Sequence, residues 1–207
     1  NFAEAMLADQ LNTAIAALCA AIANQGAATT NDVSATLGLS YTAMNSAHAL
    51  FGDASGALVA QVMNGQSYHK LIAANLANAQ NLFQSGNVLV VSVLGKPVVV
   101  TDAPALYVTG TPNKLRVLSL AEGAATVFDG RDVISNIETT NGQTRIETTM
   151  QVDYSFGLAL KGYTWDETNG GKSPTDAEIA TGSNWDKVVS DIKFTAGVVT
   201  IGDVAKA

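Results

Sequence analysis

The N-terminal segment has the periodicity of a long helix. Its larger apolar residues recur at steps of four, four, three and four positions, which places them on one face of a helix. They are Leu7, Leu11, Ile15, Leu18 and Ile22. Alanine fills most other positions, and its small side chain allows neighbouring elements to approach closely. Gly26 is a residue type that commonly follows a helix end. The pattern predicts one helix over 2–25, packed on several sides.

Shorter helical and extended patterns follow up to about residue 86. Residues 27–40 are small and polar and predict a loop. The pattern then predicts a helix over 41–51 that stops at Gly52, a short buried strand over 57–63 and a second helix over about 65–76. The second helix carries Tyr68, Leu71, Ile72 and Leu76 on one side.

The chain becomes rich in β pattern after residue 86. A tight hairpin is predicted around Leu94-Gly95-Lys96, flanked by strands over Val88–Val93 and Pro97–Thr101. Three further strands are predicted over Leu106–Thr109, Lys114–Leu120 and Ala125–Phe128.

Residues 133–150 predict a long hairpin. Asn141-Gly142 is the preferred pair for a two-residue type I′ turn. In that register Thr140 faces Gln143, Glu138 faces Arg145 and Ile137 faces Ile146, so opposite charges and like apolar residues meet. Many side chains are Thr, Asn, Gln or Glu, so we expect a ribbon that projects or pairs with a neighbour.

The C-terminal third returns to mixed pattern. An aromatic strand is predicted over 152–165, then a loop at Gly170-Gly171. Ser173-Pro174-Thr175-Asp176 reads as an N-cap followed by proline and an acid, which predicts a short helix over 174–181 that stops at Gly182. Trp185 and Val188-Val189 precede a final strand over Phe194–Ile201. The order of elements predicts an α+β protein with two interleaved lobes.

Composition points to a surface that other molecules cover. Of 207 residues, 47% are hydrophobic and only 14% are charged, whereas about a quarter is usual for a soluble domain. The net charge of −7 argues against a protein that binds nucleic acid through its phosphates. An acidic wall remains compatible with a container in which nucleic acid slides.

Two apolar runs resemble membrane or targeting segments. Ile15–Ala23 is too short to cross a bilayer, and Glu4 and Asp9 precede it where a secretory signal has basic residues. Val88–Val100 is interrupted by Gly95-Lys96-Pro97. We therefore expect no membrane-spanning stretch. Because the chain enters a helix directly from Asn1, we also expect residues upstream of it.

The residues that usually carry chemistry are scattered. Cys19 is the only cysteine, which excludes a disulfide framework and predicts a buried, inert thiol. His48 and His69, the only histidines, fall on different predicted helices. The sequence contains no HExxH, no CxxC and no phosphate-binding glycine-rich loop.

Two further patterns have a structural interpretation. Gly52-Asp53-Ala54-Ser55-Gly56 has the order G-x-x-S-G on a helix-to-strand turn, the inverse of a hydrolase elbow. Glu122, Asp129 and Asp132 are acids near a turn without calcium-loop spacing. Lys172 and Lys187 are expected as surface or subunit-contact charges. We expect no catalytic, cofactor-binding or metal-binding residue.

Residues 50–72 read LFGDASGALVAQVMNGQSYHKLI and carry a family resemblance. A helix ending in a GDA-like turn, a strand ending in V-M and a helix of S-x-x-Y-x-x-L character resemble the major capsid proteins of tailed phages. The matching positions are Gly52, Asp53, Ala54, Val62, Met63, Ser67, Tyr68 and Leu71. The S-x-x-Y spacing is compressed here to Ser67-Tyr68, and Met63-Asn64-Gly65 stands where relatives often have M-H-S.

Other stretches resemble the same family in the same order. Residues 95–104 (GKPVVVTDAP) are similar to its G-x-x-V-x-V-x-D-x-x-P strand and turn. Residues 162–165, Ser173-Pro174-Thr175 and Asn184-Trp185 resemble its closing G-F-x-W, S-P-T and N-W segments.

The resemblance implies the Hong Kong phage-type capsid fold, with a long spine helix and an antiparallel β ribbon in a peripheral domain and a mixed α/β axial domain. Residues 1–26 would be the spine helix, 27–121 the axial domain, 122–165 the peripheral strands and 166–207 a return to the axial domain. The family's N-terminal arm and extended loop are not in this sequence.

The resemblance also implies a role. The protein would be a coat protein that assembles with itself, as pentamers and hexamers, into an icosahedral head shell around double-stranded DNA in the host cytoplasm. Scaffolding, portal and decoration proteins would be further partners. An encapsulin-type compartment shell shares the fold, and terminase and portal genes or a cargo enzyme nearby would separate the two. A β-rich cell-surface module would need a secretory signal, and an enzyme would need a cleft with convergent polar groups.

Overall fold

A mixed sheet forms the centre of the protein in the computed structural model, which describes residues 2–76 and 92–206. In that part of the chain seven strands join, in the order β1-β13-β6-β2-β4-β3, with β5 also paired to β6. Their bounds are β1 Thr30–Asp32, β2 Leu58–Met63, β3 Ser92–Val93, β4 Lys96–Val100, β5 Tyr107–Val108, β6 Lys114–Ala121 and β13 Gly197–Asp203. The pairs β1–β13 and β2–β4 are parallel, and β6 is antiparallel to both of its long neighbours.

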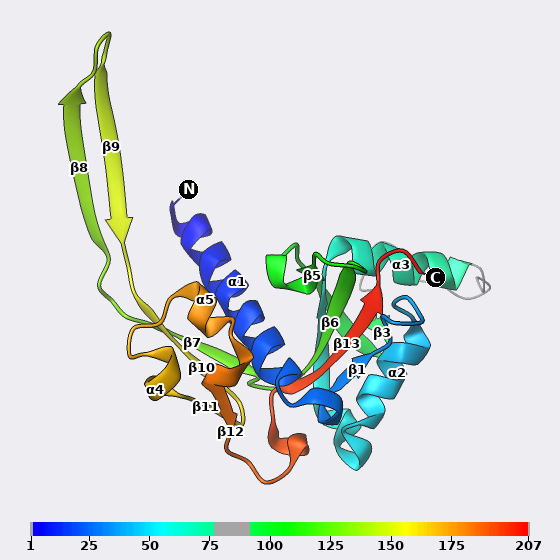
Figure 1. The fold of residues 1–207 in the computed structure, drawn as a ribbon. Helices are drawn as coiled ribbons and strands as arrows, with labels where there is room; N and C mark the ends of the chain where they lie inside the picture. The colour runs from blue at the N-terminus through cyan, green and yellow to red at the C-terminus, as the bar shows by residue number, and fades with distance from the viewer. Residues whose placement is uncertain (1, 77–91, 207) are drawn as a thin grey trace.

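Helices cover both faces of this sheet (Figure 1). The helix α1 (Phe2–Ala23) packs on one face, and α2 (Tyr41–Ala49) and α3 (Gly65–Leu76) pack on the other. Successive residues of β6 show the alternation that a strand requires. Leu118 packs in the cluster that contains residues of α1, and its neighbour Val117 packs with residues of α2 and α3.

A second group of elements packs along α1. The strand β7 (Ala125–Asp129) pairs with β10 (Phe156–Leu160), and β11 (Tyr163–Trp165) pairs with β12 (Trp185–Lys187). Two one-turn helices, α4 (Glu167–Gly170) and α5 (Asp176–Ile179), connect β11 to a 3-10 turn at Gly182–Asn184. The rings of Trp165 and Trp185 meet edge to face at 5.0 Å, and the Trp185 indole donates to the Ile179 carbonyl at 2.9 Å.

A long hairpin projects from this second group (Figure 1). It consists of β8 (Ile134–Asn141) and β9 (Ile146–Asp153), and every residue of the two strands except Val152 is exposed. The predicted hairpin and its projection are therefore confirmed.

The predicted register of that hairpin is wrong. Asn141 faces Ile146, and Gly142 N–H donates to the Arg145 carbonyl at 2.9 Å, so Gln143-Thr144 form the turn. A type I′ turn at Asn141-Gly142 needs positive φ at both residues, and neither has it. The observed register pairs β9 as far as Asp153, and these pairs outweigh the local turn preference. The slip is an even number of residues, so each side chain keeps its predicted face.

Most predicted helices and strands are confirmed with shifted ends. The helices over 41–51 and 65–76 and the strand over 57–63 agree to within two residues. The N-terminal helix ends at Ala23, and Gly26 follows with φ +59°. The final strand starts at Gly197, because Ile192–Phe194 form a 3-10 turn.

Three local predictions need correction or limits. The loop predicted over 27–40 contains β1, which adds a parallel edge strand beside β13. The strand predicted over 152–165 is three strands, interrupted after Asp153 and after Leu160. The tight hairpin turns at Leu94-Gly95, where both φ values are positive (54° and 74°) as a type I′ turn requires. The predicted strand at 88–91 lies outside the described residues.

The short helix near residue 175 begins later than predicted. Thr175, and not Ser173, is its N-cap. The Thr175 hydroxyl accepts from Glu178 N–H, and the Glu178 carboxylate accepts from Thr175 N–H at 2.7 Å. This reciprocal capping box satisfies two backbone donors at once, which Ser173 with Asp176 does not.

Candidate assembly surfaces

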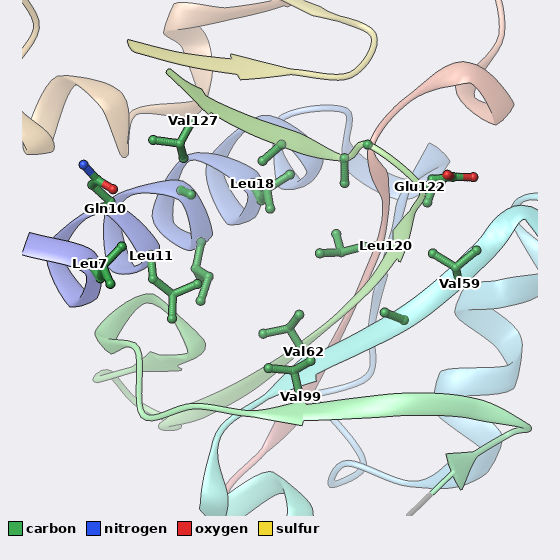
Figure 2. A pocket seen from close by; sticks show the side chains of 17 residues that line it. Leu7, Gln10, Leu11, Leu18, Val59, Val62, Val99, Leu120, Glu122 and Val127 are labelled. Atoms are coloured by element: carbon green, nitrogen blue, oxygen red, sulfur yellow. The ribbon is translucent and has the colours of Figure 1, made fainter. Parts of the chain in front are cut away.

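An apolar groove of about 590 Å³ opens between α1 and the sheet (Figure 2). Its walls come from α1, β2, β4, β6 and β7. Its floor includes buried residues such as Leu18 and Val62, and five large apolar side chains at its walls are 39–61% exposed: Leu7, Leu11, Val59, Val99 and Val127. Of the described lining residues only Gln10 and Glu122 have polar or charged side chains, and they lie at opposite ends. The groove is therefore an uncovered apolar surface without convergent polar groups.

The apolar stripe of α1 forms one wall of this groove. Ile15, Leu18 and Ile22 are buried in the core, at 3%, 3% and 0% exposure. Leu7 and Leu11 continue the same stripe but are 61% and 48% exposed. The stripe thus extends beyond the body that it stabilises, which the sequence pattern alone did not reveal.

The β8–β9 hairpin has two unlike faces. Side chains alternate across a strand, so the observed register places one set of eight residues on a single face. This uncharged face consists of Ser135, Ile137, Thr139, Asn141, Ile146, Thr148, Met150 and Val152. Ile137, Ile146 and Met150 are 65%, 70% and 62% exposed. The opposite, acidic face carries Glu138, Glu147 and Asp153.

Aromatic and polar contacts tie the base of the hairpin to the exposed half of α1. The Tyr154 hydroxyl donates to the Asp9 carboxylate. This hydrogen bond, with a smaller contribution from burial, raises the pKa of Tyr154 to about 12. The Tyr154 ring lies edge-on to Phe2 at 6.1 Å and stacks with Phe156 at 6.3 Å. Helix and hairpin base are therefore held together.

The two histidines and the cysteine lie in separate parts of the fold. His48 on α2 is buried, with Nε2 2.9 Å from the Ser119 hydroxyl, and burial, aided by the charge of Lys96, lowers its pKa. His69 on α3 is exposed. Cys19 is buried in the core, and burial raises its pKa to about 11. The structural interpretation of Cys19 and His48 fits these positions.

The acids near residue 130 stabilise turns. Asp132 accepts from the Ser155 N–H at 3.1 Å and hydroxyl at 2.6 Å, and these bonds lower its pKa. Asp129 accepts from Arg131 N–H at 3.0 Å. Glu122 lies at the rim of the groove. Among the described residues no group of three His, Cys, Asp or Glu side chains is arranged to hold a metal ion.

The Gly52–Ala57 segment forms a turn, and the two lysines predicted at the surface lie outside the core. Gly52–Ala57 form a 3-10 helix, in which Asp53 lies 2.6 Å from Lys193 Nζ. Lys172 is exposed and Lys187 is half-buried on β12. The segment resembling a hydrolase elbow is a turn between α2 and β2, as interpreted from its sequence.

The expectation of no membrane-spanning stretch needs correction. Within the described residues, α1 as a whole is long and apolar enough to cross a membrane by length and composition. The run Ile15–Ala23 is only part of the apolar helix, because alanines extend its apolar character over all 22 residues. Its C-terminal half nevertheless packs in the protein core, which is the environment of a core helix.

Exposed apolar side chains gathered along α1, the sheet edge and the hairpin are typical of a protein that contacts other subunits. Comparison with family models gives the particular family. The model named Gp13-like, described as major capsid protein 13-like, matches residues 1–199. The chain therefore belongs to this family of phage major capsid proteins, is a structural component of the virion capsid and has the mixed α+β architecture predicted for it. A search of the curated proteins gives no match.

Proposed function

We propose that this protein is the coat subunit that assembles with copies of itself into the icosahedral head shell of a tailed phage, around double-stranded DNA. The observation that carries the proposal is the exposure of two surfaces, the apolar groove and the uncharged hairpin face with its exposed Ile137, Ile146 and Met150. Burying them between subunits is favourable by about 25 cal/mol per Å². Repetition of the same contacts under rotation closes a shell.

The arrangement of elements supports a Hong Kong phage-type division of the chain. In this proposal 1–26 is the spine helix, and 122–165 supplies the strands and hairpin beside it. Residues 27–121 form the axial domain around the central sheet, to which 166–207 returns. The support is that β13, near the end of 166–207, enters the central sheet between β1 and β6, and that β7 and β10 of 122–165 contact α1.

The proposed partners are DNA, further copies of this chain and other phage proteins. The net charge of −7 suits a wall that DNA does not adhere to. Pentamers and hexamers of this chain would form in the host cytoplasm, with scaffolding, portal and decoration proteins as further partners. The proposal assigns the protein no catalytic residue, cofactor or metal, and the match to a phage capsid family favours a head shell over an encapsulin-type compartment.

Light scattering and electron microscopy of the full-length protein test the proposal. Under assembly conditions we expect closed particles of uniform diameter that show fivefold and sixfold clusters. A protein that stays monomeric across salt and concentration, with or without its scaffolding protein, contradicts the proposed function.

A further inference from the structure

We propose that the uncharged face of the β8–β9 hairpin of one copy lies in the apolar groove of a second copy of this chain. The inference rests on the proposed function and names the two surfaces that meet. It requires that the groove be left open by its own chain, that the two surfaces match in chemistry and that they match in length.

The groove is not filled by the hairpin of the same chain. The hairpin extends away from the sheet on the far side of α1 (Figure 1). The Tyr154 hydroxyl donates to Asp9 and holds the base of the hairpin against α1. Met150 and Leu7 are 62% and 61% exposed, so no described residue of the same subunit covers either side chain fully.

The two surfaces match in chemistry. Each presents Leu, Ile, Val or Met side chains and has no charge in its centre, and on the hairpin face Ser, Thr and Asn alternate with them. The acidic face of the hairpin would point to solvent, where Glu138, Glu147 and Asp153 remain hydrated. The charges match at the ends as well. Glu122 is the charged residue among the described lining of the groove, and Arg145 at the hairpin tip is the one basic residue of 133–153.

The two surfaces also match in length. Leu7 and Glu122 lie at opposite ends of the groove (Figure 2). Along α1 the wall from Leu7 to Leu18 measures about 16 Å at 1.5 Å per residue. On the hairpin the stretch from Ile137 to Asn141 measures about 14 Å at 3.4 Å per residue. With the hairpin tip directed toward Glu122, Ile137 and its cross-strand partner Met150 lie on the side of Leu7.

Thiol cross-linking within assembled particles tests this contact. We would combine Leu7→Cys with Met150→Cys and treat particles of the full-length protein with a short bifunctional maleimide. The matched control combines Leu7→Cys with Thr149→Cys, because Thr149 is adjacent in sequence but lies on the acidic face. Cys19 is not expected to react with the maleimide, since it is buried and burial raises its pKa to about 11.

The expected result is a shift of the subunit band to covalent dimers and longer multimers with Met150→Cys, and no shift with Thr149→Cys. Equal cross-linking of the two pairs overturns the inference. Dimers from the Met150→Cys single variant, which would mean contact between two hairpins, overturn it as well.

If the cysteine variants fail to assemble, an electron cryo-microscopy map of unmodified particles decides by what fills the groove. Unmodified protein that forms no particles contradicts the proposed function itself, whereas particles whose groove is empty or holds another segment or protein contradict only this inference.

Discussion

Close backbone approach between α1 and the turn before β12 leaves no space for a side chain at Gly182. A Cβ there would lie 2.6 Å from the Ala20 carbonyl oxygen, far inside normal contact. We expect Gly182→Ala to lower the free energy of unfolding of the subunit by about 1–3 kcal/mol, since α1 or the turn must shift. Urea unfolding followed by tryptophan fluorescence measures it.

Gly56→Ala is the matched control for that substitution. A Cβ at Gly56 meets no atom within 4 Å, so we expect a change within about 0.5 kcal/mol. Equal effects of the two substitutions would mean that α1 does not contact the turn as described.

Cys19 gives a prediction about pH. Its folded pKa is about 11, against 9.0 for an ordinary thiol, because of burial. Between these values the unfolded chain releases a proton that the folded chain retains, so the free energy of unfolding falls as pH rises from 9 to 11. We expect a loss of about 1–3 kcal/mol over this range.

Replacement by Cys19→Ala removes that part of the pH slope. The slope, and not the stability at one pH, is the readout, because the smaller side chain also leaves a cavity. Burial raises the pKa of Tyr163 to about 12 and adds a similar loss above pH 10, which remains in the variant. An unchanged slope between pH 9 and 10 would place Cys19 in contact with water.

At the scale of elements, the two halves of α1 serve different purposes. Ile15→Ala removes buried contacts, and we expect it to lower the free energy of unfolding by about 2–5 kcal/mol. Leu7→Ala truncates a side chain that is 61% exposed, so we expect a change within about 0.5 kcal/mol in the isolated subunit. Sedimentation of assembly mixtures should show that Leu7→Ala nevertheless needs a higher protein concentration to form particles. Equal destabilisation of the subunit by the two variants would refute this division.

The helices and strands could be predicted from the sequence only as far as their patterns are local. The stripe from Leu7 to Ile22 predicted α1, because helical periodicity is a local property. It did not show that burial ends near Thr13, since that depends on where β7 and the sheet lie. The hairpin was predicted from alternation, but its register was set by pairs near Asp153 rather than by Asn141-Gly142. The groove joins Leu7, Val59 and Val99 from three distant segments, and no signal in the sequence connects them.

At the scale of the whole molecule, the low charge of the chain predicts how assembled particles respond to salt. Apolar contacts are not screened by ions, and repulsion between subunits of net charge −7 weakens as salt increases. We therefore expect particles to stay intact, or to form more readily, as ionic strength rises from about 0.1 M to about 1 M. Dynamic light scattering follows their diameter. Dissociation at high salt would indicate that ion pairs hold the shell together.

Hydrogen–deuterium exchange, compared between assembled particles and dissociated subunits, tests most directly that copies of this chain cover its exposed apolar surfaces. On assembly we expect slower exchange in the N-terminal half of α1 and in β8–β9, and little change in β6 and β13, which the subunit already buries. Equally fast exchange of α1 and β8–β9 in particles and in subunits would contradict the account.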